Sequence, residues 1–242
     1  MQILNLGCGA KTSNAPEIVN IDYSIYLRVR KLRVLAPLVP LFFRGDRLKR
    51  FTEIPDNIMV HNLAKGIPFP DNSVDAVYHS HLFEHLDRDV ADRFLIEVRR
   101  VLKPEGIHRI VVPDFEALCR AYVSHFDACD MSSGECHRHD SQLFPILEQS
   151  VRREASGTSH QGRVRRLLEN RILGDARRRG ETHQWMYDRI NLREKAIAAG
   201  YKAVQLQSYT SSLIPGWIDY GLDVDEHGRQ YKPGSLYMEA VK

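Results

Sequence analysis

The sequence contains few cysteines and no long apolar run, and these two scarcities exclude several classes of protein. Four cysteines among 242 residues are too few for a small disulfide-bonded scaffold. The longest apolar run, residues 34–43, contains two prolines and is half the length of about 20 residues that a membrane-spanning helix needs. Residue 1 leads directly into a strand-like pattern, without the charged and apolar regions of a secretory signal, so we expect a cytoplasmic location.

Glycine, proline and net charge are also unremarkable in amount. With 15 Gly, 11 Pro, 43% hydrophobic residues and a formal charge of +3, the composition is that of an ordinary globular protein, not of a collagen-like or disordered chain. The length suits one large domain, and we assign residues 1–242 to a single domain.

Positive charge is concentrated in two segments. Residues 23–51 carry a net charge of +7 and residues 151–180 a net charge of +6, which leaves the rest of the chain acidic. Such segments favour an anionic partner such as a phosphate, an acidic sugar, nucleic acid or a lipid headgroup. The alternative is that the two segments form solvated surfaces without a partner, because exposed charges need no partner.

Short apolar runs alternate with helical patterns in the first half of the chain. The predicted strands are residues 2–6, 18–21, 58–61, 74–78 and 107–112, and a helix is expected from Asp87 to Leu102. Between the first two strands the chain has room for only one or two helical turns. The alternation predicts a doubly wound α/β sheet with functional loops at the carboxyl ends of its strands.

The second half is less regular. We predict helices at 115–126 and 189–199, a polar Cys/His-rich loop at 127–142, and strands at 203–209 and 235–241 that pair antiparallel at one sheet edge. The expected architecture is therefore a Rossmann-like sheet of seven strands, mostly parallel, with an inserted helical cap formed by residues 23–57 and 115–188.

A Gly-x-Gly turn follows the first strand, and an acid ends the second. Gly7 and Gly9 let backbone come close to a ligand, and Asp22 can accept both hydroxyls of a ribose. Thr12 stands where a dinucleotide-binding turn has its third glycine, which counts against NAD or FAD, and no Walker A phosphate-binding loop is present.

Four segments together resemble a known family. LNLGCG (4–9), VNID (19–22), HNLAKGIPFPDNSVDAVYHSHLFEHL (61–86) and EVRRVLKPEGIHRIVVPD (97–114) are similar to successive motifs of class I S-adenosylmethionine-dependent methyltransferases of the small-molecule "type 11" kind. Three later segments, HQWMYDR (183–189), SLIPGW (212–217) and KPGSLYMEA (232–240), look more loosely like predicted methyltransferases that are often found with polysaccharide-biosynthesis genes.

The resemblance implies S-adenosyl-L-methionine as cofactor and a set of residues that bind it. Leu6, Gly7, Cys8 and Gly9 would lie at the methionine end, Asp22 would accept the ribose hydroxyls, and Ser80 would sit beside the sulfonium. Asn62 and Leu63 would contact the adenine. Asn62 replaces the Asp that the family commonly has, although its amide oxygen still accepts a hydrogen bond.

A cluster of histidines offers candidates for the base that a hydroxyl acceptor needs. His79, His81 and His85 follow one another at the mouth of the fourth strand, where Glu84 can orient a neighbour, and His183 can face them from the cap. We predict His81, His85, His183 and Glu84 as the catalytic group. The alternative is that Glu84 and His85 only hold the cofactor loop in place.

A metal site is not predicted. Cys129, Cys136, His137 and His139 lie within 11 residues, but their spacing is not a usual zinc pattern, and a polar loop is the favoured interpretation.

The favoured function is O-methylation of a small molecule, sugar or glycan precursor that is anionic through a phosphate or a lipid-linked phosphate. Residues 27–43, basic and then apolar, can also rest on an anionic membrane surface. Two alternatives remain, an RNA methyltransferase and a non-catalytic cofactor-binding partner subunit. A nucleic-acid substrate is disfavoured because the sequence lacks an Asn/Asp-Pro-Pro-Tyr motif and a basic stripe with interleaved aromatic residues. The sequence does not fix the acceptor or the oligomeric state.

Overall fold

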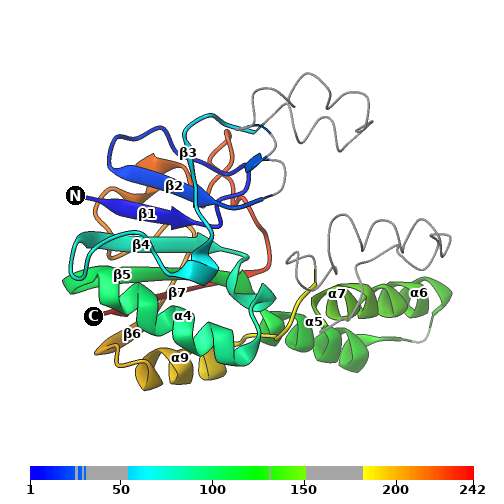
Figure 1. The fold of residues 1–242 in the computed structure, drawn as a ribbon. Helices are drawn as coiled ribbons and strands as arrows, with labels where there is room; N and C mark the ends of the chain where they lie inside the picture. Colours follow the sequence, from blue (N-terminus) through cyan, green and yellow to red (C-terminus); the bar gives the residue numbers. More distant parts are fainter. Residues whose placement is uncertain (25–26, 29, 31–53, 131, 151–181) are drawn as a thin grey trace, which may run out of the picture.

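The computed structural model describes residues 1–24, 27–28, 30, 54–130, 132–150 and 182–242 (Figure 1). Most of the first basic segment therefore lies outside the described residues, and so does most of residues 27–43, the segment expected to rest on a membrane surface. All of the arginine-rich segment 151–180 lies outside them as well.

A seven-stranded sheet forms the centre of the molecule, as the sequence predicts (Figure 1). Its spatial order is β3-β2-β1-β4-β5-β7-β6, and β7 alone pairs antiparallel, with β5 on one side and β6 on the other. The strands are β1 (Ile3–Leu6), β2 (Ile18–Asp22), β3 (Ile58–Val60), β4 (Val74–Ser80), β5 (Leu102–Pro113), β6 (Ala203–Gln207) and β7 (Ser235–Val241). The parallel strands all end at one edge of the sheet, where the site described below lies.

Strand β5 begins five residues earlier than the sequence predicts. Leu102 pairs with Val74, and the next paired residues are Ile107 and Ala76, so an irregularity in the register accommodates the four residues between them. Glu105 in this segment has a left-handed φ of 64°. The Lys-Pro-Glu-Gly sequence thus ends the preceding helix and also forms a bulge in the strand.

The connection from β1 to β2 contains no helix, contrary to the expected one or two turns. Two buried asparagines hold it instead. The Asn5 amide donates to the Lys11 carbonyl oxygen at 3.0 Å and to the Asn20 side-chain oxygen at 2.9 Å, and the Asn20 amide donates to the Ser13 carbonyl oxygen at 2.9 Å. These side chains satisfy backbone groups that a helix would otherwise pair.

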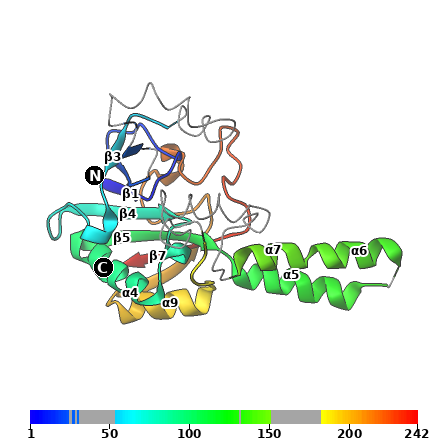
Figure 2. The same ribbon diagram turned by 45° about the vertical axis from the view of Figure 1, so that its right-hand side comes forward.

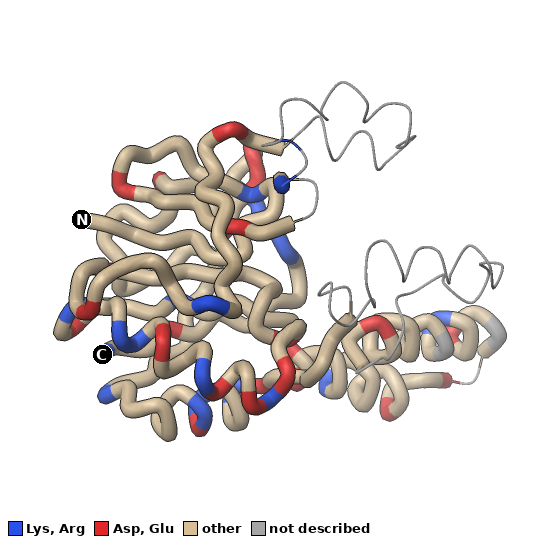
Figure 3. Tube along the Cα trace, viewed as in Figure 1, with Lys and Arg blue, Asp and Glu red and all other residues tan. Residues whose placement is uncertain are grey.

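Two helices cover one face of the sheet (Figure 1). Helix α4 (Arg88–Val101) buries Ala91, Phe94, Leu95, Val98 and Val101, an apolar stripe at helical spacing, against this face. Helix α9 (Arg189–Ala198) begins at a capping box in which Asp188 accepts from the backbone N–H of Asn191 at 2.9 Å. Acidic and basic residues alternate along the outer surfaces of both helices (Figure 3).

The opposite face is covered by residues 208–223, which include the short 3-10 helix η5 (Trp217–Tyr220). Arg109 of β5, fully buried, holds this segment to the sheet. Its guanidinium donates to Asp223 at 2.8 Å, to Glu239 at 2.7 Å and to the carbonyl oxygens of Ser208 and Ser211 at 2.7 and 2.9 Å. One cation therefore joins β5, β7 and the covering segment.

Helices α5 (Phe115–Ala128), α6 (Ser133–Ser141) and α7 (Leu143–Gln149) form an arm that projects from the sheet (Figure 2). The prediction of a polar loop at 127–142 is wrong, because α6 occupies most of this range. His139 of α6 packs on the rings of Tyr122 and His125, whose centroids are 4.9 and 5.4 Å away.

The part of the chain that the structure describes has no helix with both the length and the apolar character to cross a membrane.

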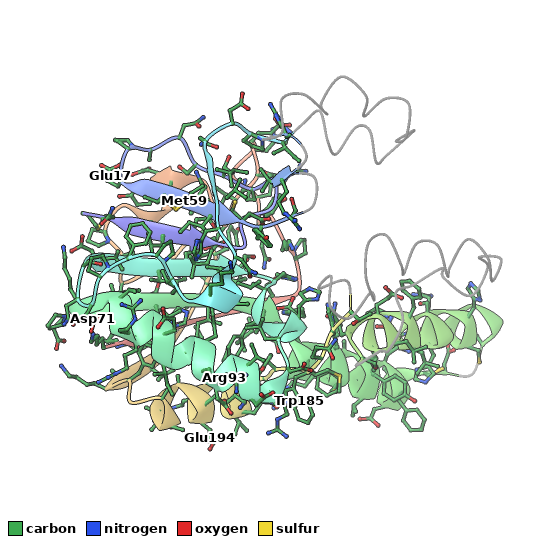
Figure 4. All side chains as sticks on the ribbon, in the orientation of Figure 1. Glu17, Met59, Asp71, Arg93, Trp185 and Glu194 are labelled. Carbon is green, nitrogen blue, oxygen red and sulfur yellow. The ribbon has the colours of Figure 1, made fainter. Side chains whose placement is uncertain are left out.

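Loss of the Arg109 guanidinium is expected to destabilise the protein strongly. Arg109→Ala leaves the carboxylates of Asp223 and Glu239 buried without their cation, which costs about 3–5 kcal/mol. The free energy of unfolding in urea measures this loss. Arg93→Ala is the matched control, because Arg93 forms an exposed pair with Asp89 on α4 (Figure 4) and should change the free energy by about 0.5 kcal/mol or less. Equal effects of the two substitutions would contradict the role given to Arg109.

Candidate active site

A cavity of about 250 Å³ lies at the carboxyl ends of β1 and β4. Residues from four parts of the chain line it: Asn5 and the loop from Gly7 to Lys11, Tyr78 and Ser80 at the end of β4, His81, and the pair Tyr231 and Lys232 before β7. The sheet places these segments together, because parallel neighbours end at a common edge.

The glycine turn has the shape that close approach of a ligand requires. Gly7 and Gly9 have φ values of 61° and 54°, in the left-handed region that disfavours a side chain. A Cβ atom on Gly7 would lie 3.0 Å from the side chain of Leu82, whereas the space beside Gly9 is open for 4 Å. The turn therefore offers exposed backbone next to the cavity.

Asp22 lies next to this turn at the end of β2. Its carboxylate accepts from the backbone N–H of Gly9 at 2.9 Å and from that of Ser24 at 2.8 Å. One lone pair on each oxygen remains for a further donor. The open backbone of the turn and the adjacent carboxylate offer the kinds of group that would hold the methionine and ribose ends of S-adenosylmethionine.

The other predicted cofactor residues fall at the same sheet edge, with different degrees of access. Ser80 and Cys8 line the cavity, and burial raises the pKa of the Cys8 thiol to about 12, so the thiol is neutral. The side chain of Leu6 is fully buried in the core and leaves only backbone for a ligand. Asn62 follows β3 and precedes the 3-10 helix Leu63–Lys65. Its side-chain oxygen accepts from the Ala64 N–H at 3.0 Å. The oxygen expected to face adenine therefore already caps this helix.

The four predicted catalytic residues lie together. His81 has a left-handed φ of 51°, and the short 3-10 helix η3 (Phe83–His85) follows it. Glu84 Oε1 is 3.4 Å from His81 Nδ1 and 3.8 Å from His85 Nε2, and the rings of His85 and His183 are 4.8 Å apart. The backbone N–H of Gln184 donates to the Glu84 carbonyl oxygen at 2.7 Å, which fixes the segment containing His183 against η3.

Burial shifts the pKa values of this group toward neutral side chains. Burial raises the pKa of the Glu84 carboxyl to about 8, since the charged form has lost water. Burial also lowers the pKa of His81 to about 3 and that of His85 to about 4, with smaller contributions from His183 and Lys232. The imidazoles are therefore neutral near pH 7 and keep their lone pairs.

Several other predicted candidates lie elsewhere. His79 points into the core, where it is fully buried and packs between Phe94 and His108 at ring distances of 5.4 and 5.0 Å. Tyr187 is part of the core, and Trp185 packs against it. Cys129, Cys136, His137 and His139 form no set of converging ligands among the residues described.

Lys11, Tyr231, Lys232 and Ser235 are cavity or site residues that we did not predict. Lys11 donates to the Val224 carbonyl oxygen at 2.6 Å and lies over the Tyr231 ring. Burial lowers the pKa of Lys232, and the charge of Glu84 acts in the opposite direction. The KPGSLYMEA segment was the available signal, but the register that brings it beside His81 is a property of the folded sheet.

Part of the chain matches a protein-family model, and several solved structures are similar to the chain at low identity. Residues 4–110 match the family model described as "Methyltransferase domain". Among solved structures, a SAM-dependent methyltransferase from Archaeoglobus fulgidus is 14% identical, with 100% of this chain and 86% of that chain covered and a TM-score of 0.43. A SAM-dependent methyltransferase from Aquifex aeolicus is 22% identical over 48% of this chain and 57% of that one, with a TM-score of 0.30. A search of curated proteins found no match.

The segment 4–110, which is less than half of the chain, matches this methyltransferase family model and includes most of the motifs that resemble class I S-adenosylmethionine-dependent methyltransferases. This segment contains β1 to β4, most of β5, the glycine turn, Asp22, and the His81 to His85 group. The remaining part of the sheet and the cavity residues Tyr231 and Lys232 come from outside the matched residues.

Removal of the Asp22 carboxylate should weaken cofactor binding. Asp22→Ala removes acceptors for the ribose and for Gly9 N–H, and charged hydrogen bonds of this kind contribute about 1.5–3 kcal/mol, or roughly 10- to 100-fold in affinity. Calorimetric titration with S-adenosylhomocysteine measures the change. Glu17→Ala, at the amino end of β2 (Figure 4), is the control and should bind as the wild type does. Unchanged affinity in a folded Asp22→Ala protein would remove Asp22 from the cofactor site.

Proposed function

We propose that the protein transfers a methyl group from S-adenosylmethionine to an oxygen of an anionic small molecule, sugar or glycan precursor. The observation that carries this proposal is the single cavity in which the glycine turn, Ser80, His81 and Lys232 meet. Four of the proposed cofactor residues, Gly7, Cys8, Gly9 and Ser80, thus line the same cavity as His81.

Methyl transfer to a hydroxyl asks little covalent chemistry of the protein. When bound, S-adenosylmethionine supplies an electrophilic methyl group; its sulfur–methyl bond breaks as the acceptor oxygen–methyl bond forms. The protein aligns the acceptor and excludes water, and the acceptor hydroxyl gives its proton to a basic group. His81 is the histidine at the cavity wall, and its neutral imidazole has a lone pair that can accept this proton.

Lys232 supports an anionic acceptor. Its side chain lines the cavity, and within the described part of the chain its ammonium forms no hydrogen bond or close ion pair with a carboxylate, although the charge of Glu84 acts on it. A partly buried cation without a close partner favours an anionic ligand such as a phosphate or carboxylate. The basic segments 23–51 and 151–180 are consistent with the same acceptor class but lie mostly outside the described residues.

An acceptor screen tests the proposed reaction. Protein and methyl-labelled S-adenosylmethionine are incubated with sugar nucleotides, phosphorylated sugars, lipid-linked sugars, their dephosphorylated forms and RNA, and labelled product is analysed by mass spectrometry. We expect O-methylated product from a phosphorylated acceptor. Methylation of RNA alone would replace this proposal by the nucleic-acid function, and cofactor binding without turnover in every pool would favour a non-catalytic subunit.

Neutralising Lys232 should affect the acceptor more than the cofactor. Lys232→Gln is expected to raise the KM for a phosphorylated acceptor about tenfold or more, because an ion pair to the ligand is lost, while the Kd for S-adenosylhomocysteine stays within about twofold. Lys202→Gln removes an exposed lysine that pairs with Glu105 and is the control. If Lys232→Gln instead weakens S-adenosylhomocysteine binding, Lys232 serves the cofactor carboxylate.

A further inference from the structure

Strand β6 forms one edge of the sheet (Figure 1). Within the described part of the chain it pairs with β7 alone, and this pairing runs from Ala203 to Gln207 without a bulge. Its sequence, Ala-Val-Gln-Leu-Gln, contains no charged residue and no proline. Short length, charge, proline and bulges are the features that usually protect an edge strand from pairing with another chain. The opposite edge strand, β3, is only three residues long, whereas β6 has none of these protections.

An apolar groove of about 550 Å³ runs beside β6. Val204 and Leu206 of β6 line it, together with Met238 of β7. Helix α9 contributes Ile190 and Ile197 to the same groove. Leu206, Ile190 and Ile197 are 51%, 72% and 40% exposed. The groove and the open edge of β6 therefore form one apolar surface, which gains free energy if another apolar surface covers it.

Two charged residues of α9 also line this groove and have no partner. Arg193 and Glu194 share one stripe of the helix with residues 190 and 197, because these positions are three and four apart. Among the described residues neither side chain forms an ion pair, whereas the neighbouring Lys195 pairs with Asp92. Glu194 lies at the end of the molecule where the order of the strands finishes with β6 (Figure 4). A cation and an anion side by side complement a copy of the same surface turned by 180°.

Strand β6 is complementary to itself in the same way. When two copies of β6 run antiparallel about Gln205, Val204 of each copy lies opposite Leu206 of the other. Alternate residues of a strand share a face, so these apolar pairs form on the groove side of both strands. All five residues of the strand are then paired across the junction.

We propose that the protein forms a two-fold symmetric dimer through β6 and α9. The two β6 strands pair antiparallel about Gln205 and join the two seven-stranded sheets, and the apolar side chains of each groove cover those of the other. Arg193 of each copy faces Glu194 of the other, because a two-fold axis makes every contact reciprocal. The charges and the strand register both match themselves, which favours a second copy of this chain over an unrelated peptide.

The mass of the whole chain in solution tests the dimer. Sedimentation equilibrium at micromolar concentration should give twice the chain mass of 27.9 kDa. Leu206→Lys places a charge in the apolar junction and should weaken dimerisation about 100-fold or more. Ile96→Lys is the matched control, because Ile96 is a similarly exposed apolar residue on α4, and it should leave the dimer unchanged. Circular dichroism checks that both variants are folded.

A charge exchange tests the contact between the two helices. Arg193→Glu and Glu194→Arg should each weaken dimerisation about tenfold, because like charges then face each other across the axis. The variant with both substitutions should recover the wild-type dimerisation constant to within about threefold. This recovery is expected only if the two residues meet in the dimer.

Disulfide cross-linking tests the register. Cys136→Ser first removes the exposed native thiol. In that background Gln205→Cys should give a cross-linked dimer with oxidised glutathione, because directly opposite residues have Cα atoms about 4.5–5.5 Å apart, within the range of a disulfide. Gln207→Cys is the control; it lies opposite Ala203 of the other copy and should not cross-link.

Three results would overturn the dimer: a folded wild-type protein that stays monomeric, a dimer that Leu206→Lys leaves intact, or no recovery in the doubly exchanged variant. Cross-linking through Gln207→Cys but not through Gln205→Cys would overturn the register. None of these measurements involves cofactor or methyl transfer, so their failure is distinct from failure of the proposed function.

Discussion

The buried guanidinium of Arg109 is the interaction on which the carboxyl-terminal half of the structure depends. It lies in the middle of the sheet and pairs with Glu239 on β7 and with Asp223 in the segment that covers the sheet. Asp223 in turn accepts from the Tyr78 hydroxyl at 2.8 Å and from the Trp217 indole N–H at 2.7 Å. Four side chains from β4, β7 and the covering segment are therefore held around one desolvated charge, whose pairing is incomplete if any of these segments moves away.

This network also positions the site. The chain passes from Asp223 through Tyr231 and Lys232 to Ser235, where β7 begins. Because Arg109 holds Asp223 before the cavity residues and Glu239 after them, it fixes both ends of the segment that lines the cavity. Ser235 then holds the His81 ring, and the Glu84 backbone holds the segment with His183. The histidine group is thus supported both from within residues 4–110 and by two later parts of the chain, residues 182–184 and Ser235.

The positions of the strands along the chain could be predicted because their pattern is local. Short apolar runs that end in Gly7, Asp22 and Ser80 specify buried parallel strands, and such strands place their final residues at a common edge. The family motifs located the same residues. Where prediction failed, side chains had replaced the expected backbone pairing, as Asn5 and Asn20 do between β1 and β2. In α6, helical packing of His139 on Tyr122 and His125 overrode a polar sequence that is typical of a loop.

The sequence by itself indicated the resemblance to methyltransferases and determined the sheet, the glycine turn with its acid, and the identity of the histidines near the fourth strand, because all of these follow from residues close together in the chain. Only the tertiary structure decided which nitrogen of each histidine faces Glu84, that His79 belongs to the core, and that Lys232 and Ser235 join the site. The contacts of His81 with Ser235 and of His85 with Thr182 join residues about 100 to 150 positions apart, and burial by such contacts also removes water from the site.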